Sequence, residues 1–124
     1  MSGRIYRGNV LEHAIYPRNR GTLDPADFSY EDAGSVCGDE VRIDVRVKDG
    51  YVDAVAFSGR GCAVSQASAS VLTELILQMG IEEVKALTED TLLAAIGVPL
   101  GPTRTECALL SLTVLRAAVS APVP

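Results

Sequence analysis

The sequence contains no tryptophan, and aromatic side chains make up only 5% of its 124 residues. Apolar residues still account for 48% of the chain, so a buried core must consist mainly of valine, leucine, isoleucine and alanine. Basic residues are also few, with 11 lysines and arginines against 16 acidic residues and a net charge of −5. This balance argues against a nucleic-acid-binding protein, because contact with a phosphate backbone needs a basic face.

Long apolar runs are missing as well. No stretch approaches the ~18 consecutive apolar residues of a membrane span, and the polar residues 1–8 lead into no apolar run, so we expect no signal peptide. The three cysteines are odd in number, which argues against a disulfide framework. We therefore expect one domain over residues 1–124, ordered over 5–119 with a frayed C-terminal tail, and reduced thiols in the cytoplasm.

Hydrophobic periodicity predicts an α+β fold. The clearest signal is a strand over residues 40–48, in which valine and isoleucine alternate with charged residues. Asp49-Gly50 is typical of a hairpin turn and predicts a return strand over 51–58, while residues 28–36 form a weaker first strand. We expect about five helices, over residues 5–15, 63–79, 81–87, 88–96 and 103–119, the last opening on the capping-box pattern Thr103–Glu106. These elements predict a small three-stranded antiparallel sheet with the helices packed on one face.

The cysteines are the residues most suited to chemistry. Cys37 and Asp39 are separated by Gly38, whose backbone freedom lets a thiol and a carboxylate turn toward one point. Cys62 and Cys107 each lie where a helix is expected to begin, and the positive end of a helix favours thiolate over thiol. Three thiolates and one carboxylate make a plausible ligand set for zinc or an iron–sulfur cluster. Without a C-x-x-C pair, three small buried hydrophobic residues remain the alternative.

Other polar residues give weaker signals. His13 is the single histidine and is interpreted either as a metal ligand or, preferentially, as a polar residue at a helix end. Asp44 and Asp53 alternate with apolar residues and are expected on solvated strand faces. The segment Gly59-Arg60-Gly61 is too short for a phosphate-binding loop and lacks the following lysine.

Four segments together resemble the U-type iron–sulfur scaffold proteins, the family that includes IscU, SufU and the N-terminal domain of NifU. They are His13–Gly21, Cys37-Gly38-Asp39, the Gly-Cys pair with its serine- and alanine-rich continuation in Gly61–Ser70, and Cys107 at the last helix. The resemblance covers residues 5–119, which is nearly the whole chain.

This resemblance implies that Cys37, Asp39, Cys62 and Cys107 line one exposed end of the fold and bind iron or zinc. In the family this site takes persulfide sulfur from a cysteine desulfurase, assembles a transient [2Fe–2S] cluster and passes it to apo-proteins. Cys37 matches the sulfur acceptor, with Cys107 as the second candidate. Such a protein is a scaffold rather than an enzyme, and a monomer or weak homodimer. The alternatives are a zinc-bound sulfur relay, which would be a sulfurtransferase, and a module with structural zinc only.

Two features depart from the family pattern. Glu106 stands where related chains have histidine or lysine before the last cysteine, and its carboxylate could bind metal, repel an anionic cluster or complete the capping box. The Leu-Pro-Pro-Val-Lys segment read by a chaperone in IscU-type proteins is replaced by Leu100-Gly101-Pro102-Thr103. The sequence therefore leaves the IscU-like and SufU-like subtypes open.

Overall fold

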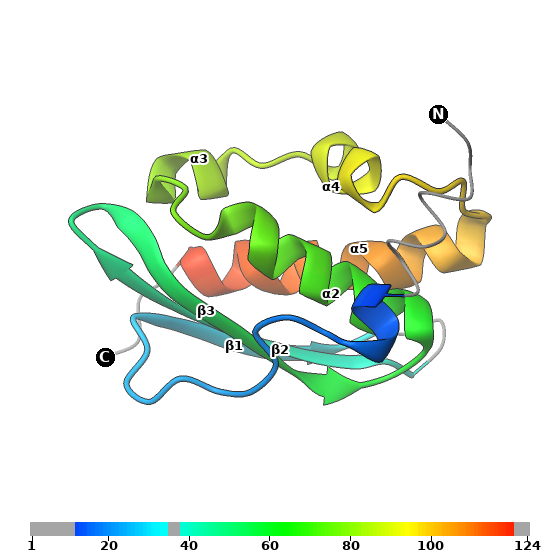
Figure 1. The fold of residues 1–124 in the computed structure, drawn as a ribbon, viewed down its shortest axis with the longest axis horizontal. Helices are drawn as coiled ribbons and strands as arrows, with labels where there is room; N and C mark the ends of the chain where they lie inside the picture. Colours follow the sequence, from blue (N-terminus) through cyan, green and yellow to red (C-terminus); the bar gives the residue numbers. More distant parts are fainter. Residues whose placement is uncertain (1–11, 35–37, 121–124) are drawn as a thin grey trace.

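The computed structural model describes residues 12–34 and 38–120 of the chain. Three strands form one antiparallel sheet in the order β1-β2-β3, and helices lie on one face of it (Figure 1). The elements are the strands β1 (Phe28–Ala33), β2 (Glu40–Lys48) and β3 (Tyr51–Arg60) and the helices α2 (Ala63–Ile76), α3 (Ile81–Lys85), α4 (Glu89–Ile96) and α5 (Pro102–Val119). The predicted α+β architecture is confirmed.

The hairpin β2–β3 follows directly from its sequence. Asp49 and Gly50 both take positive φ values, 55° and 83°, which suit the right-handed twist of a two-residue hairpin. The register then pairs Ile43 with Phe57 and Val45 with Val55, so the apolar residues of both strands share the face that the helices cover. β1 pairs with the other edge of β2.

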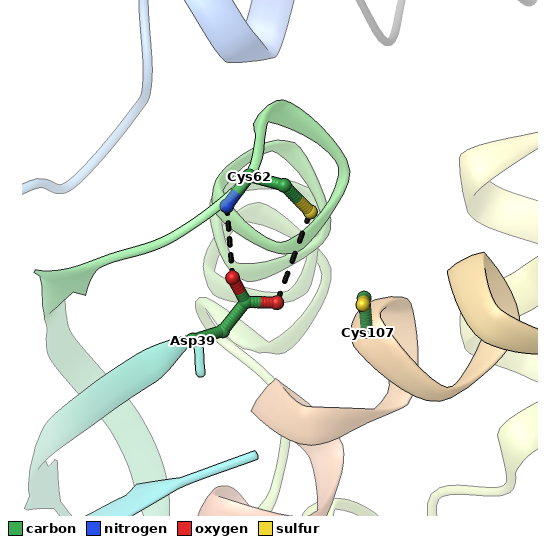
Figure 2. Close-up of side chains that lie close together, drawn as sticks. All are labelled: Asp39, Cys62 and Cys107. Carbon is green, nitrogen blue, oxygen red and sulfur yellow. Dashed lines mark hydrogen bonds between the residues drawn. The ribbon is translucent and has the colours of Figure 1, made fainter. Parts of the chain in front are cut away.

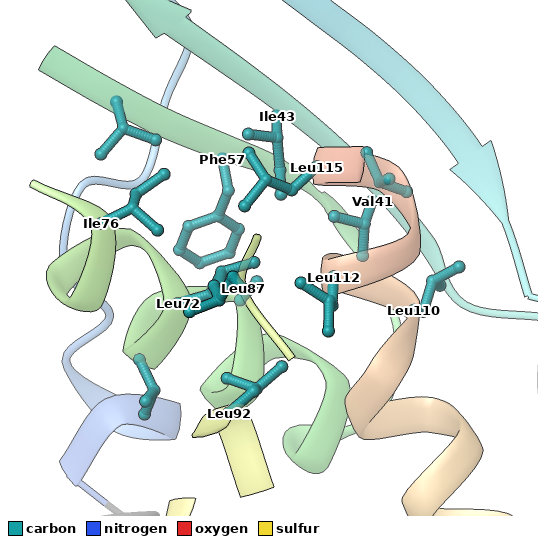
Figure 3. Packing of buried hydrophobic residues seen from close by; sticks show 14 of the residues in the cluster. Val41, Ile43, Phe57, Leu72, Ile76, Leu87, Leu92, Leu110, Leu112 and Leu115 are labelled. Carbon is teal, nitrogen blue, oxygen red and sulfur yellow. The ribbon is translucent and has the colours of Figure 1, made fainter. Parts of the chain in front are cut away.

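Two helices form the layer next to the sheet. The first turns of α2 are rich in serine and alanine, and these small side chains let α5 pack closely against it. Ser68, buried within this interface, donates a hydrogen bond to the Ala108 carbonyl of α5. Phe57 lies at the centre of the core, with Leu72 and Ile76 of α2 and Leu115 of α5 around it (Figure 3).

Several helix boundaries differ from the prediction. α2 ends at Ile76, so that Gly80 caps the start of α3 rather than the end of α2. α5 begins at Pro102 with Gly101 as its N-cap, so the predicted capping box at Thr103 is wrong. Proline suits the first helical position, because its missing N–H would have no partner there. Of the predicted first helix, residues 12–15 are described and form a helical turn.

Asp44 is buried, so the prediction that it lies on a solvated strand face is wrong. It lies on the outer face of the sheet but is 0% exposed, because the loop before β1 covers it. Its carboxylate accepts hydrogen bonds from the Leu23 N–H at 3.0 Å and from the Ser29 hydroxyl, and it pairs with Arg42 at 3.0 Å.

In the described part of the chain, none of the helices combines the length and the apolar character that a membrane crossing requires.

Candidate metal centre

Three side chains from separate parts of the chain meet at one end of the sheet. Asp39 directly precedes β2, Cys62 lies between β3 and α2, and Cys107 lies in the second turn of α5. One carboxylate oxygen of Asp39 and the two sulfur atoms all lie within 4.8 Å of one another. Figure 2 shows the three groups turned toward a common space. The predicted convergence is thus present for these three residues.

Asp39 is fixed by the start of α2. The Cys62 N–H donates to Oδ1 of Asp39 at 2.9 Å, and the Cys62 sulfur lies 3.8 Å from Oδ2 (Figure 2). The Asp39 side chain is 1% exposed. Gly38 takes a φ of 68°, a conformation that favours glycine, and so turns the chain into β2 at this point.

Gly61 makes this approach sterically feasible. A Cβ atom at position 61 would lie 2.2 Å from Oδ1 and 2.6 Å from Cγ of Asp39, and 2.7 Å from the Ser65 hydroxyl oxygen. These separations are shorter than non-bonded atoms tolerate, so only glycine leaves room for the carboxylate. The sequence placed Gly61 before the cysteine, but its contact with Asp39 depends on tertiary structure.

The Cys62 side chain caps the start of α2. Cys62 is the N-cap of α2, and its sulfur accepts a hydrogen bond from the Ser65 N–H at 3.5 Å. Unpaired N–H groups give a helix start a partial positive charge, which stabilises an anion. The residue is also exposed, so an incoming sulfur or metal atom can reach it.

Cys107 is 5% exposed and contributes its sulfur from α5. This sulfur is disulfide-bonded in the structure, contrary to the expectation of reduced thiols, so it can act as a ligand only after reduction. In the reduced protein the site would offer two thiolates and one carboxylate. Ligand atoms around a tetrahedral zinc are separated by roughly 3.3–3.8 Å, which needs only a small closure of the present arrangement. The donor set therefore fits zinc or an iron of a cluster.

Three further candidate residues were named from the sequence, Cys37, Glu106 and His13. Cys37 lies outside the described residues, so its predicted place among the ligands stays a prediction. Glu106 is exposed, and among the described residues the converging donor atoms belong to Asp39, Cys62 and Cys107 alone. The His13 ring is hydrogen-bonded to α2, because its Nδ1 lies 2.7 Å from the Ser70 hydroxyl. Its interpretation as a polar helix-end residue fits better than that as a ligand.

Comparison with known proteins identifies the family of this chain. The family model of the NifU-like N-terminal domain matches residues 5–121. The iron–sulfur cluster assembly scaffold protein IscU of Thermotoga maritima is 38% identical over 86 residues, which cover 69% of this chain and 61% of that protein. The mitochondrial iron sulfur cluster assembly protein 1 of Schizosaccharomyces pombe is 33% identical, over 96% of this chain and 63% of its own length. The chain thus spans less than two thirds of these two relatives.

Solved structures show the same fold. A protein from Fervidobacterium islandicum AW-1, assigned as an iron–sulfur cluster assembly scaffold for the SUF system, superposes with a TM-score of 0.79 at 25% identity. The match covers 96% of this chain and 99% of that one. The N-terminal part of a nitrogen-fixing NifU-like protein from Brucella abortus gives a TM-score of 0.76 at 22% identity, covering 95% and 94% of the two chains.

Proposed function

Because this chain belongs to the family of NifU-like N-terminal domains, we propose that it is an iron–sulfur cluster assembly scaffold. It accepts persulfide sulfur from a cysteine desulfurase, assembles a transient [2Fe–2S] cluster and passes this cargo to apo-proteins. The observation that carries the proposal is the meeting of Asp39, Cys62 and Cys107 within 4.8 Å. Two thiolates and a carboxylate are ligands of the type that zinc and iron–sulfur irons accept.

In this proposal Cys37, Asp39, Cys62 and Cys107 hold the metal or cluster. Cys37 is the sulfur acceptor and Cys107 the second candidate. The acceptor thiolate attacks the outer sulfur of the desulfurase persulfide, a new S–S bond forms, and the desulfurase cysteine leaves as a thiolate. Asp39 supplies a harder and more exchangeable ligand than thiolate, which suits a cluster that must later be released.

The partners are accordingly a cysteine desulfurase and apo-proteins that receive the cluster. An exposed Cys62 at the end of the sheet supports transfer between proteins, since the donor and the recipient must both reach the site. A cytoplasmic location and a monomer or weak homodimer remain predictions made from the sequence.

A second function is a zinc-bound sulfur relay for the same desulfurase. The similarity to a SUF-system protein at a TM-score of 0.79 supports this alternative, as does the fit of the donor set to zinc. Both functions use the same residues. They differ in whether the site holds iron and sulfide after sulfur arrives.

The two functions are separated by an anaerobic desulfurase assay with the reduced protein, cysteine and ferrous iron. A scaffold forms a cluster absorbance while persulfide appears on the protein. A relay keeps its zinc, stimulates the desulfurase and forms no cluster. If neither the desulfurase rate nor persulfide labelling changes on adding the protein, both proposed functions are rejected. The remaining alternative is then a module with structural zinc only.

A further inference from the structure

The strand β1 leaves one edge of the sheet open. It pairs with β2 on one side, and among residues 12–34 and 38–120 no strand or isolated bridge lies on its other side. The opposite edge of the sheet is covered at Phe57 of β3, which donates to the Asn19 carbonyl at 2.9 Å and accepts the Gly21 N–H at 2.7 Å. The backbone groups of an open edge are able to pair with a further strand.

The register shows which backbone groups of β1 face outward. The Gly34 N–H donates to the Asp39 carbonyl at 2.7 Å and continues the pairing of β1 with β2 by one residue. In an antiparallel pair, hydrogen-bonded residues alternate with residues whose N–H and C=O point away from the neighbouring strand. Ser29, Glu31 and Ala33 therefore present these groups to the open edge.

Acidic side chains line this edge. Glu31 and Asp32 are exposed, and neither forms an ion pair within the described part of the chain. Asp32 accepts the Ala33 N–H at 2.8 Å, so the open donors are the N–H groups of Ser29 and Glu31. A second copy of β1 paired here would bring like charges together, which is destabilising, whereas a positively charged strand would be stabilised.

The open edge also leads to the metal centre. Gly34 follows β1 directly and is hydrogen-bonded to the backbone of Asp39, whose carboxylate is one of the three converging donors. Glu31 lies three residues before Gly34, which is roughly 10 Å of extended chain. A strand added along β1 would therefore run up to the centre.

We propose that the open edge of β1 is the docking strand for an extended, positively charged segment of the apo-protein that receives the cluster. The outward N–H and C=O groups of Ser29 and Glu31 bind the main chain of this segment, and the carboxylates of Glu31 and Asp32 select its charge. The inference rests on the proposed function for the role of the partner. Docking here brings the recipient next to Asp39, the exchangeable ligand of the centre.

The test uses a synthetic peptide of alternating lysine and valine, whose binding is followed by amide NMR spectra. We expect the signals of Ser29 and Glu31 to shift in the wild type. Glu31→Pro removes an N–H that points away from β2, which an edge strand tolerates, and places a ring where the added strand would lie. It should weaken peptide binding at least tenfold and leave the circular dichroism and the zinc affinity unchanged.

A second variant tests the charge without touching the backbone. Glu31→Gln combined with Asp32→Asn should weaken peptide binding roughly two- to tenfold. The matched control is Glu82→Gln combined with Glu83→Gln, which removes the same charge from exposed positions of α3 and should change the affinity less than twofold. This pair keeps the test decisive if Glu31→Pro does not fold.

The role of the partner is tested on the cluster-loaded wild type. Excess peptide should slow cluster transfer to an apo-acceptor at least threefold and leave sulfur uptake from the desulfurase unchanged. Inhibition of sulfur uptake alone would assign the edge to the desulfurase and overturn the inference, as would self-association of the wild type that Glu31→Pro abolishes in sedimentation experiments.

Failure of the inference is distinct from failure of the proposed function. Unchanged peptide binding by both edge variants, or an equal loss in the control on α3, overturns the inference while the scaffold function stands, because none of these variants alters a metal ligand. A wild type that takes up no cluster overturns the proposed function and, with it, the recipient's role at this edge.

Discussion

Asp39 serves two purposes with its two carboxylate oxygens. Oδ1 accepts the Cys62 N–H at 2.9 Å and so satisfies one of the N–H groups at the start of α2, while Oδ2 faces the Cys62 sulfur. The ligand that gives the centre its exchangeable oxygen therefore also supports the fold around it. Substitutions at this residue must be chosen to separate the two effects.

Asp39→Ala and Asp39→Asn achieve that separation. Both remove the anionic ligand, so both are expected to slow cluster transfer and lengthen the life of an assembled cluster. Asparagine retains an oxygen that can accept the Cys62 N–H, whereas alanine leaves this N–H unpaired. Alanine should therefore lower the free energy of unfolding by about 1–3 kcal/mol and asparagine by less. Cluster absorbance during transfer to an apo-acceptor and urea denaturation measure the two effects, and equal transfer rates in all three proteins would refute the ligand role.

Gly61→Ala tests the steric basis of the centre. The added Cβ would lie 2.2 Å from Oδ1 of Asp39 and force the buried carboxylate away from Cys62. We expect at least a tenfold loss of zinc affinity in the reduced protein, in line with the effect of removing support around a metal ligand. Gly101→Ala is the control, because a Cβ there has nothing within 4 Å. Competition titration with a coloured chelator would contradict this account if both variants bound zinc as tightly as the wild type.

At the scale of elements, the segment before β1 is fastened along α2 by polar contacts. The Ser70 hydroxyl lies 2.7 Å from Nδ1 of His13 and accepts the Arg18 N–H at 2.8 Å, and the Asn19 amide donates to Thr73 at 3.1 Å. The blue helical turn lies beside α2 in Figure 1. This segment holds Arg20 against the start of α2, so it links the N-terminal part of the fold to the metal centre.

His13 makes this attachment sensitive to pH. Burial lowers the pKa of His13; the nearby Glu74 and Glu12 carboxylates oppose the shift, and Arg18 adds to it. The neutral ring is therefore favoured in the folded state, whereas the unfolded chain takes up a proton near pH 6.5. The stabilisation is complete above that pH and is lost as the pH falls below it.

The prediction compares wild type with His13→Asn by urea denaturation at pH 7.5 and pH 5. The wild type should be more stable than the variant by about 1–3 kcal/mol at pH 7.5, and this difference should shrink at pH 5. Taking the difference between the two proteins cancels the titration of carboxylates that both share. A difference that grows toward pH 5 would show that His13 is stabilised in its protonated form instead.

At the scale of the whole molecule, the core does not depend on the metal. Buried aliphatic residues from the sheet and from α2, α4 and α5 pack around Phe57 (Figure 3). The metal-free protein should therefore keep its helical circular dichroism. Zinc at a hundred times its dissociation constant should raise the melting temperature of the reduced protein by roughly 10 °C. A chelated sample without helical signal would contradict this and assign the zinc a structural role.

Much of this fold could be predicted from local patterns. The alternation in β2 and the Asp49-Gly50 turn are local signals, and both elements formed as expected. The same alternation could not reveal that Asp44 is buried, because the loop that covers it is distant in sequence. The cysteine positions predicted the centre through family resemblance, but the contact of Gly61 with Asp39 arises only when separate elements meet.

The central claim is that this site builds an iron–sulfur cluster on converging ligands. It is tested most directly by measuring iron and acid-labile sulfide after desulfurase-driven anaerobic assembly on the reduced wild type and on Cys62→Ser. Serine is similar in size to cysteine but a poor substitute for a thiolate ligand, so the variant should fold normally. The account predicts equal amounts of iron and sulfide on the wild type and almost none on Cys62→Ser. Equal loading of the two proteins, or a wild type that holds zinc and no sulfide, would contradict it.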